Sequence, residues 1–205
     1  MKKVVIFDFD GVILDSMPIK TYAFREIFKN FLGEAIEMLI QFHLENGGIS
    51  RFVKIRYFFE DILGQNISES DVKKYADKFS DIVTAELVKP KYLVDETVEF
   101  IESLYGRKRL FIASGAEENE LRYLCANFGI DGYFEGIYGS PAPKSELLRI
   151  IVDKSEADTN ECAMIGDSIN DYEAAAKNKI PFYGYNNEEL RGIENYIDSF
   201  REFVF

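Results

Sequence analysis

The sequence predicts an α/β fold with a parallel-sheet core and an inserted α-helical domain. From residue 95 onward, short apolar runs typical of buried strands alternate with helical patterns of about ten residues, and this alternation is typical of right-handed crossovers in a parallel sheet. One earlier apolar run, at residues 4–7, is followed by a long stretch with helical periodicity only. We therefore expect the first strand to join the later sheet, with the helical stretch inserted after it.

The helical insert is expected at residues 16–88. Its apolar residues recur at intervals of three and four, as on one buried helix face, and no part of it alternates like a strand. Gly47 and Gly48 end one expected helix, and Ser68 is placed to cap another. The spacing predicts a bundle of about four helices. Because Pro90 breaks the last of them, we expect an α/β core at residues 1–15 and 89–205 and the insert at 16–88.

The remaining elements follow from periodicity and length. A segment at the C-terminal end, residues 195–205, fits a last strand or a helix equally well. The other expected helices are 95–105, 117–128, 145–154 and 169–178, and the expected strands are 109–114, 133–139, 162–167 and 180–185.

Composition excludes some classes of function. A net charge of −12 argues against nucleic-acid binding, which needs a basic face. Asp8 interrupts the N-terminal apolar run too early for a signal peptide, and no other run is long enough to cross a membrane. Two cysteines, Cys125 and Cys162, are expected to be reduced and buried rather than disulfide-bonded. We expect a cytoplasmic protein with no membrane or nucleic-acid partner, either a monomer or a homodimer.

Polar residues follow several of the expected strands at their carboxyl ends. In parallel sheets this edge is where ligands bind. The residues concerned are Asp8, Asp10 and Gly11 after the first strand, Ser114 and Gly115 after the second, Lys144 after the third, and Asp167 and Asp171 after the fourth. Converging carboxylates normally hold a hard cation such as Mg²⁺, whereas a lysine and a hydroxyl bind an anion. A phosphoryl group next to Mg²⁺ explains both, and a carboxylate can attack its phosphorus.

Each of these residues also has a purely structural interpretation. Asp10 and Gly11 fit a common turn, and small residues such as Ser114 and Gly115 fit a tight strand-to-helix connection. Lys144 fits a solvated surface charge, and Asp171 fits an exposed acid near a helix N-terminus. The order of these residues, each after its own strand, favours a shared site over coincidence.

The same residues resemble the motifs of the haloacid dehalogenase (HAD) superfamily. The stretch "DFDGVILDS" is similar to its first motif, DxDGxxxDS, and "IASGA" to its second. Lys144 corresponds to the third-motif lysine, and "IGDSINDYEAA" is similar to the fourth motif, GDSxxD. A helical insert between the first two motifs is the family's C1-type cap. The resemblance covers the whole chain and points to the branch of phosphoglycolate phosphatases and β-phosphoglucomutases, with a Rossmann-like core.

The resemblance implies a role for each motif residue. Asp8 is the expected nucleophile, and Asp10 the general acid and base. Mg²⁺ is expected on Asp8, the backbone carbonyl of Asp10 and Asp167, with Asp171 orienting Lys144 or a metal-bound water. The expected phosphate ligands are Ser114, Lys144 and the backbone amides at Gly11 and Gly115.

Asp10 indicates which of the family's reactions to expect. Dehalogenases and phosphonatases of this superfamily lack an acid two positions after the nucleophile, so its presence favours hydrolysis of a phosphate ester. A phosphomutase remains the alternative, although Glu117 and Glu118 after the second motif are poor hosts for a second phosphate. Two further alternatives are a phospho-accepting signalling module and a binding protein that has lost catalysis.

Substrate recognition is expected from the insert. Arg51 and Lys54, one helical turn apart, are placed to bind a carboxylate or a distal phosphate of a small phosphate ester, or else are solvated surface charges. His43, the single histidine, is interpreted as structural or superficial rather than catalytic. Sugar phosphates, phosphoglycolate-like acids and nucleotides remain open as substrates.

Overall fold

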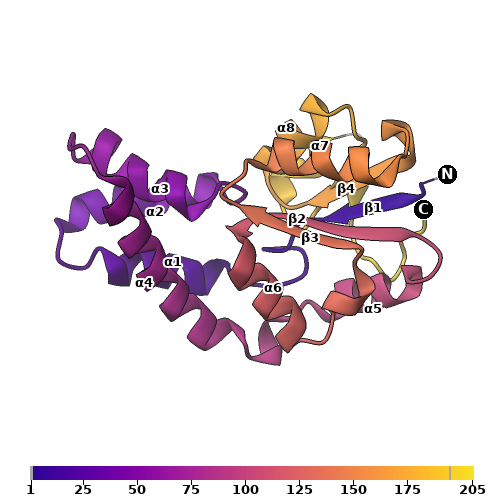
Figure 1. Ribbon diagram of the computed structural model, residues 1–205, viewed down its shortest axis with the longest axis horizontal. Coiled ribbons are helices and arrows are strands. Elements are labelled where there is room, and N and C mark those ends of the chain that lie inside the picture. Colours follow the sequence, from indigo (N-terminus) through magenta and orange to yellow (C-terminus); the bar gives the residue numbers. More distant parts are fainter. Residues whose placement is uncertain (1, 194) are drawn as a thin grey trace.

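A computed structural model describes residues 2–193 and 195–205 of the chain. Its centre is a six-stranded sheet in the order β3-β2-β1-β4-β5-β6, in which all neighbouring strands are parallel (Figure 1). The strands are β1 (Val4–Phe7), β2 (Arg109–Glu117), β3 (Gly136–Ser140), β4 (Cys162–Gly166), β5 (Phe182–Tyr185) and β6 (Tyr196–Ile197). The first strand joins this sheet, as expected, and lies between β2 and β4.

Helices cover both faces of this sheet. In Figure 1, α7 and α8 lie on one side of the strands, and α5 and α6 lie on the other. Their bounds are α5 (Asp95–Leu104), α6 (Glu118–Asn127), α7 (Lys144–Ser155) and α8 (Ile169–Lys177). Side chains of β1 alternate between the two faces of the sheet: Val5 and Phe7 pack in one hydrophobic cluster, while Val4 and Ile6 pack in the other. Both faces of the central strand are therefore buried, which explains its continuous apolar sequence.

The segment between β1 and α5 forms a separate group of helices at one end of the molecule (Figure 1). It contains α1 (Met17–Ile27), α2 (Gly33–Glu45), α3 (Arg51–Tyr57) and α4 (Glu69–Leu87), and a π-helical turn (Phe58–Ile62) continues α3. Stacked and edge-to-face rings of Phe28, Phe31, Phe58 and Phe59 fill its centre. The Ser68 hydroxyl accepts a hydrogen bond from the Asp71 amide, as predicted for an N-cap. We call α1–α4 the helical insert.

Several sequence-based boundaries were wrong. Residues 131–133 form a 3₁₀ turn rather than part of a strand, so the third strand begins only at Gly136. The second strand runs to Glu117, beyond the expected end at Ser114, and its pairing with β3 shifts register between Ala113 and Glu117. The segment that fitted either a strand or a helix contains the two-residue strand β6. The two cysteines are buried and free.

Candidate active site

Three carboxylates, two buried and one partly buried, gather at the carboxyl end of the central strands. Asp8 directly follows β1, and Asp167 and Asp171 lie in and after the loop that follows β4. One carboxylate oxygen from each lies within 4.8 Å of the other two. The backbone amide of Phe9 donates to Asp8 Oδ1 at 2.7 Å, which fixes the first carboxylate. The topology thus brings together acids that are far apart in sequence.

Like charges in this cluster shift its acid–base equilibria. Burial, reinforced by the charge of Asp171, raises the pKa of Asp8 to about 7, against the opposing effect of Lys144. Burial and the charge of Asp8 likewise raise the pKa of Asp167 well above its usual value. Three carboxylates so close together are an unfavourable arrangement for a protein alone, and oxygen donors of this kind suit a divalent cation. The cluster fits a metal such as the one that the sequence predicts.

Lys144 is the counter-charge on one side of the cluster. It is the first residue of α7, and its ammonium group is 2.9 Å from Asp8 Oδ1 and donates to Asp171 Oδ1. Burial lowers the pKa of Lys144, but the two aspartates outweigh burial and raise it. The interpretations of Lys144 as a solvated charge and of Asp171 as an exposed acid were wrong, because both side chains are buried. Asp171 also closes a capping box with Ser168, which fixes its orientation.

Asp10 is not part of the three-carboxylate cluster and instead contacts the start of the insert. Its carboxylate accepts a hydrogen bond from Ser16 Oγ at 2.5 Å and another from Lys20 Nζ. Burial pushes the pKa of Asp10 upward, but Lys20 and Ser16 together hold it below its ordinary value. Lys20 is not among the site residues predicted from the sequence; the available signal is its place four residues after Ser16, which puts both side chains on one helix face.

Two glycines allow the close approaches at this edge. Gly11 has φ +75°, and a β-carbon there would lie 1.9 Å from Asp167 Oδ2, so a side chain at position 11 would displace that carboxylate. A β-carbon on Gly115 would lie 2.5 Å from the carbonyl oxygen of Gly48 in the insert. Ser114 is fully buried, and its Oγ accepts from the Ala116 amide at 3.1 Å. The structure therefore places Gly11 beside the acidic cluster and Gly115 against the insert.

The helical insert closes over this edge of the sheet. A cavity of about 20 Å³ remains between the insert and the core, lined by Asp10 and Gly115 together with Lys20, His43, Arg51 and Lys54 of the insert. A second hollow of about 380 Å³ is lined in part by Gly48, Gly115 and Lys144. The candidate site is therefore shared between the core and the insert.

Arg51 lies at the contact between the insert and the core. Its guanidinium donates to Glu120 of α6 through both terminal nitrogens, at 2.5 and 2.7 Å, and to Ser80 Oγ at 2.6 Å. It also lies over the ring of Phe79, 4.5 Å from the centroid. Arg51 and Lys54 are both buried, so their interpretation as solvated surface charges was wrong. Glu120 is not among the residues predicted from the sequence, because its pairing with Arg51 depends on how the insert packs against the core.

Lys54 and His43 form a second buried pair in the insert. Lys54 Nζ is 2.9 Å from His43 Nδ1, and each residue is almost fully buried. Burial first, and then the charge of Lys20, lower the pKa of Lys54 to about 7. Burial and the charge of Lys54 lower the pKa of His43 far below its usual value, so its ring is neutral. His43 is thus buried rather than superficial.

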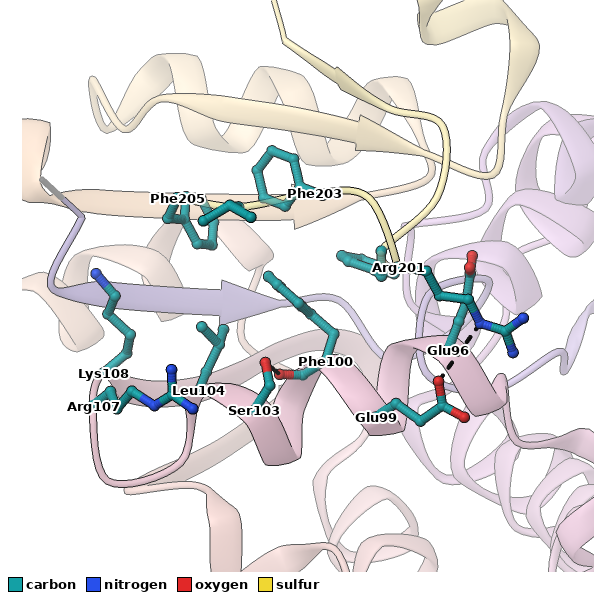
Figure 2. A pocket seen from close by; sticks show the side chains of 12 residues that line it. Glu96, Glu99, Phe100, Ser103, Leu104, Arg107, Lys108, Arg201, Phe203 and Phe205 are labelled. Carbon is teal, nitrogen blue, oxygen red and sulfur yellow. Dashed lines mark hydrogen bonds and ion pairs between the residues drawn. The ribbon is translucent and has the colours of Figure 1, made fainter.

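A larger hollow lies away from this site. It has a volume of about 520 Å³ and runs along α5 and the C-terminal segment, where aromatic rings including Phe100, Phe203 and Phe205 line it (Figure 2). An ion pair between Arg201 and Glu99, at 3.6 Å, crosses one end of it. None of the motif residues lines this hollow, so its size does not make it the candidate active site.

Among the described residues, no helix is long and apolar enough to span a bilayer.

Comparisons with known proteins show what the chain is similar to. The family model of haloacid dehalogenase-like hydrolases matches residues 2–178. A 5'-nucleotidase of Pseudomonas aeruginosa is 26% identical, covering 91% of this chain and 86% of its own. A phosphoglycolate phosphatase of Colwellia psychrerythraea is 25% identical, covering 92% and 88%. The crystal structure of a β-phosphoglucomutase from Clostridium difficile has a similar fold, with a TM-score of 0.78, 18% identity and coverage of 100% of this chain and 94% of that one.

Proposed function

Because the chain belongs to the family of haloacid dehalogenase-like hydrolases, we propose that it is a Mg²⁺-dependent phosphatase that hydrolyses a small phosphate monoester. The observation that carries this proposal is the cluster of Asp8, Asp167 and Asp171, in which Lys144 bridges Asp8 and Asp171. The similarity to a nucleotidase and a phosphoglycolate phosphatase supports a phosphate ester as substrate.

In the proposed first step, an Asp8 carboxylate oxygen attacks phosphorus. The bond between phosphorus and the ester oxygen breaks, the leaving oxygen takes a proton from Asp10, and an aspartyl-phosphate forms on Asp8. The phosphate dianion brings negative charge close to Asp10, and this charge favours the protonated form of the Asp10 carboxyl group. Ser114, Lys144 and the amides at Gly11 and Gly115 are proposed to hold the phosphoryl oxygens.

In the proposed second step, water attacks the phosphorus of the aspartyl-phosphate. Asp10 takes a proton from the water, the acyl phosphate bond breaks, and inorganic phosphate leaves while Asp8 returns to its carboxylate form. The ion pair with Lys20 and the hydrogen bond from Ser16 favour the ionised form of Asp10 that this step requires.

The acidic cluster fits Mg²⁺ in charge and donor type. Asp8 and Asp167 are proposed to hold it with the backbone carbonyl of Asp10, while Asp171 orients Lys144. When bound, the cation neutralises the carboxylates and shields negative charge on the phosphoryl group.

The insert, residues 16–88, is proposed to act as the cap over the core. Hydrolysis is favoured over phosphoryl transfer within the substrate, because the charge of Arg51 is already neutralised by Glu120. A mutase needs cationic partners for a second phosphate, and Glu117 and Glu118 add negative charge to the segment that would help to hold it. Closure of the insert supports an enzyme that excludes bulk water during turnover.

The test is phosphate release from p-nitrophenyl phosphate and a panel of metabolite phosphates. We expect release with Mg²⁺, none with a chelator, and a loss of at least 1,000-fold in Asp8→Asn. Asp153→Asn, the same change at an exposed position of α7, serves as the matched control. Full activity of Asp8→Asn would remove the nucleophile assignment. Conversion of a hexose 1-phosphate to the 6-phosphate without phosphate release would favour the mutase.

A further inference from the structure

The small cavity between insert and core joins the candidate catalytic residue Asp10 to the buried pair of Lys54 and His43. The leaving group of a phosphate ester bound at Asp8 must lie on the Asp10 side, because Asp10 is the proposed proton donor to its oxygen. The groups that line this cavity are therefore the groups that contact the leaving group.

The cationic side chains that line the cavity differ in whether they have a carboxylate partner. Lys20 is paired with Asp10, and Arg51 is paired with Glu120 through two hydrogen bonds. Lys54 forms no ion pair with any carboxylate in residues 2–193 and 195–205. Within the described part of the chain, its ammonium group hydrogen-bonds only to His43, with Nδ1 at 2.9 Å and the backbone oxygen at 3.4 Å. A buried cation is costly without a negative partner.

His43 adds a second unused donor. A charged Lys54 ammonium group can only donate, so Nδ1 then accepts and the neutral ring carries its hydrogen on Nε2. This Nε2 atom is buried and has no hydrogen-bond partner among the residues that the structure describes. A buried donor left unpaired costs free energy comparable to a lost hydrogen bond. Lys54 and His43 therefore offer donors only, and no acceptor in the surrounding described chain uses them fully.

We propose that Lys54 and His43 form a binding subsite for a carboxylate on the leaving group, so that the substrate is a short phosphorylated hydroxy acid. This inference rests on the proposed phosphatase function. A carboxylate supplies the missing negative charge and acceptors in one planar group. The cavity of about 20 Å³ has room for about one water, so the preference for a carboxylate rests on the unpaired donors of Lys54 and His43 and not on volume.

The lowered pKa of Lys54 agrees with a subsite that is incomplete without its ligand. Asp10 and Asp167 lie near enough to favour the charged form, but Lys20 and Arg51 oppose it. Arg51, which also lies in α3, already forms an ion pair with Glu120. The structure therefore distinguishes Lys54 from Arg51 as a ligand for a substrate anion, whereas the sequence alone does not.

The experiment compares three esters of two-carbon leaving groups. These are phosphoglycolate, its neutral counterpart 2-hydroxyethyl phosphate, and the bisphosphate of ethylene glycol. For the wild-type protein with Mg²⁺, we expect kcat/KM to be at least tenfold higher for phosphoglycolate than for either other ester. Lys54→Gln is expected to reduce the ratio of phosphoglycolate to the neutral ester at least tenfold, as for the loss of a hydrogen bond to a charged group. Lys73→Gln, an exposed position on α4, is the matched control.

A binding measurement separates this inference from the proposed chemistry. Calorimetric titration of the Asp8→Asn variant with the same compounds needs no turnover, and Asp8→Asn/Lys54→Gln is compared with it. Tighter binding of phosphoglycolate that disappears with Lys54→Gln supports the subsite, even if no ester is hydrolysed by the wild type and the proposed function falls. Equal affinity for the acid and neutral esters, or a preference that survives Lys54→Gln, would overturn it. A preference for the bisphosphate would overturn the carboxylate assignment.

Discussion

Arg51 of the helical insert and Glu120 of the core form a buried ion pair with two parallel hydrogen bonds, at 2.5 and 2.7 Å. The two residues are 69 positions apart in the sequence, and both side chains are only 3% exposed. This pair joins α3 to α6 and therefore holds the insert against the sheet. It also determines which cations of the insert remain available to a ligand.

Glu120→Gln is expected to destabilise the protein by about 3 kcal/mol in denaturant unfolding. The substitution keeps the shape of the side chain but leaves the Arg51 charge buried without a carboxylate, which is the costly way to break such a pair. Removing both charges in Arg51→Leu/Glu120→Leu should recover most of that loss, because no charge then remains buried. A double variant as unstable as Glu120→Gln would contradict this interpretation.

The motif residues could be predicted from the sequence because each follows a recognisable strand. The apolar run Val4–Phe7 indicates the central strand, and an acid directly after it must lie at the edge of the sheet where the other strands end. The same reasoning identified Lys144 and Asp167. Local pattern and a general rule of parallel sheets were sufficient for these positions.

The contacts made by the insert could not be predicted in this way. Glu120 lies in the first turn of an ordinary helix, and its partner depends on how two parts of the chain pack together. His43 and Lys54 belong to different helices, α2 and α3, and meet only because of the crossing of those helices. Helix periodicity places these residues on faces, but it does not determine which faces meet.

Gly11→Ala is expected to abolish most activity, whereas Gly106→Ala should not. Both glycines have nearly the same left-handed backbone, with φ of +75° and +73°, so each alanine should cost roughly 1 kcal/mol of stability for that conformation. A β-carbon at position 11 meets Asp167 Oδ2, whereas at position 106 it meets no atom within 4 Å. Similar losses of stability with activity retained only in Gly106→Ala would support the contact. Equal activities would contradict it.

Mg²⁺ is expected to raise the unfolding temperature, and a chelator should remove the effect. The cation relieves repulsion among Asp8, Asp167 and Asp171, and a ligand that binds only the folded state stabilises it by mass action, by about 2.7 kcal/mol at 100 times its Kd. Asp167→Asn should reduce this metal-dependent shift and should also stabilise the metal-free protein, since one like charge is gone. The shift is measured by calorimetry in both variants at matched ionic strength, with Asp153→Asn as the control. A shift of the same size in Asp167→Asn would place the metal elsewhere.

Lys54→Met is expected to change the free energy of unfolding more favourably at pH 7 than at pH 10. In the folded state the pKa of Lys54 is lowered from 10.5 to about 7, chiefly by burial, so the unfolded chain holds a proton on this amine that the folded chain gives up. The resulting loss of stability is fully present below pH 7 and disappears as the pH rises to about 10.5. At about 1.4 kcal/mol for each pKa unit, its full size is on the order of 5 kcal/mol.

The pH dependence separates the effect of the Lys54 charge from the effect of losing its hydrogen bond to His43. Methionine cannot donate to His43, and the orphaned Nδ1 costs a similar amount at pH 7 and pH 10, because the ring stays neutral at both. Subtracting the two pH values therefore cancels that cost and isolates the charge of Lys54. Denaturant unfolding of wild type, Lys54→Met and the exposed control Lys73→Met at both pH values measures it. If the free energies of unfolding of Lys54→Met and Lys73→Met change equally with pH, Lys54 is not a destabilising cation. Its charge would then give no reason to expect an anionic ligand beside it.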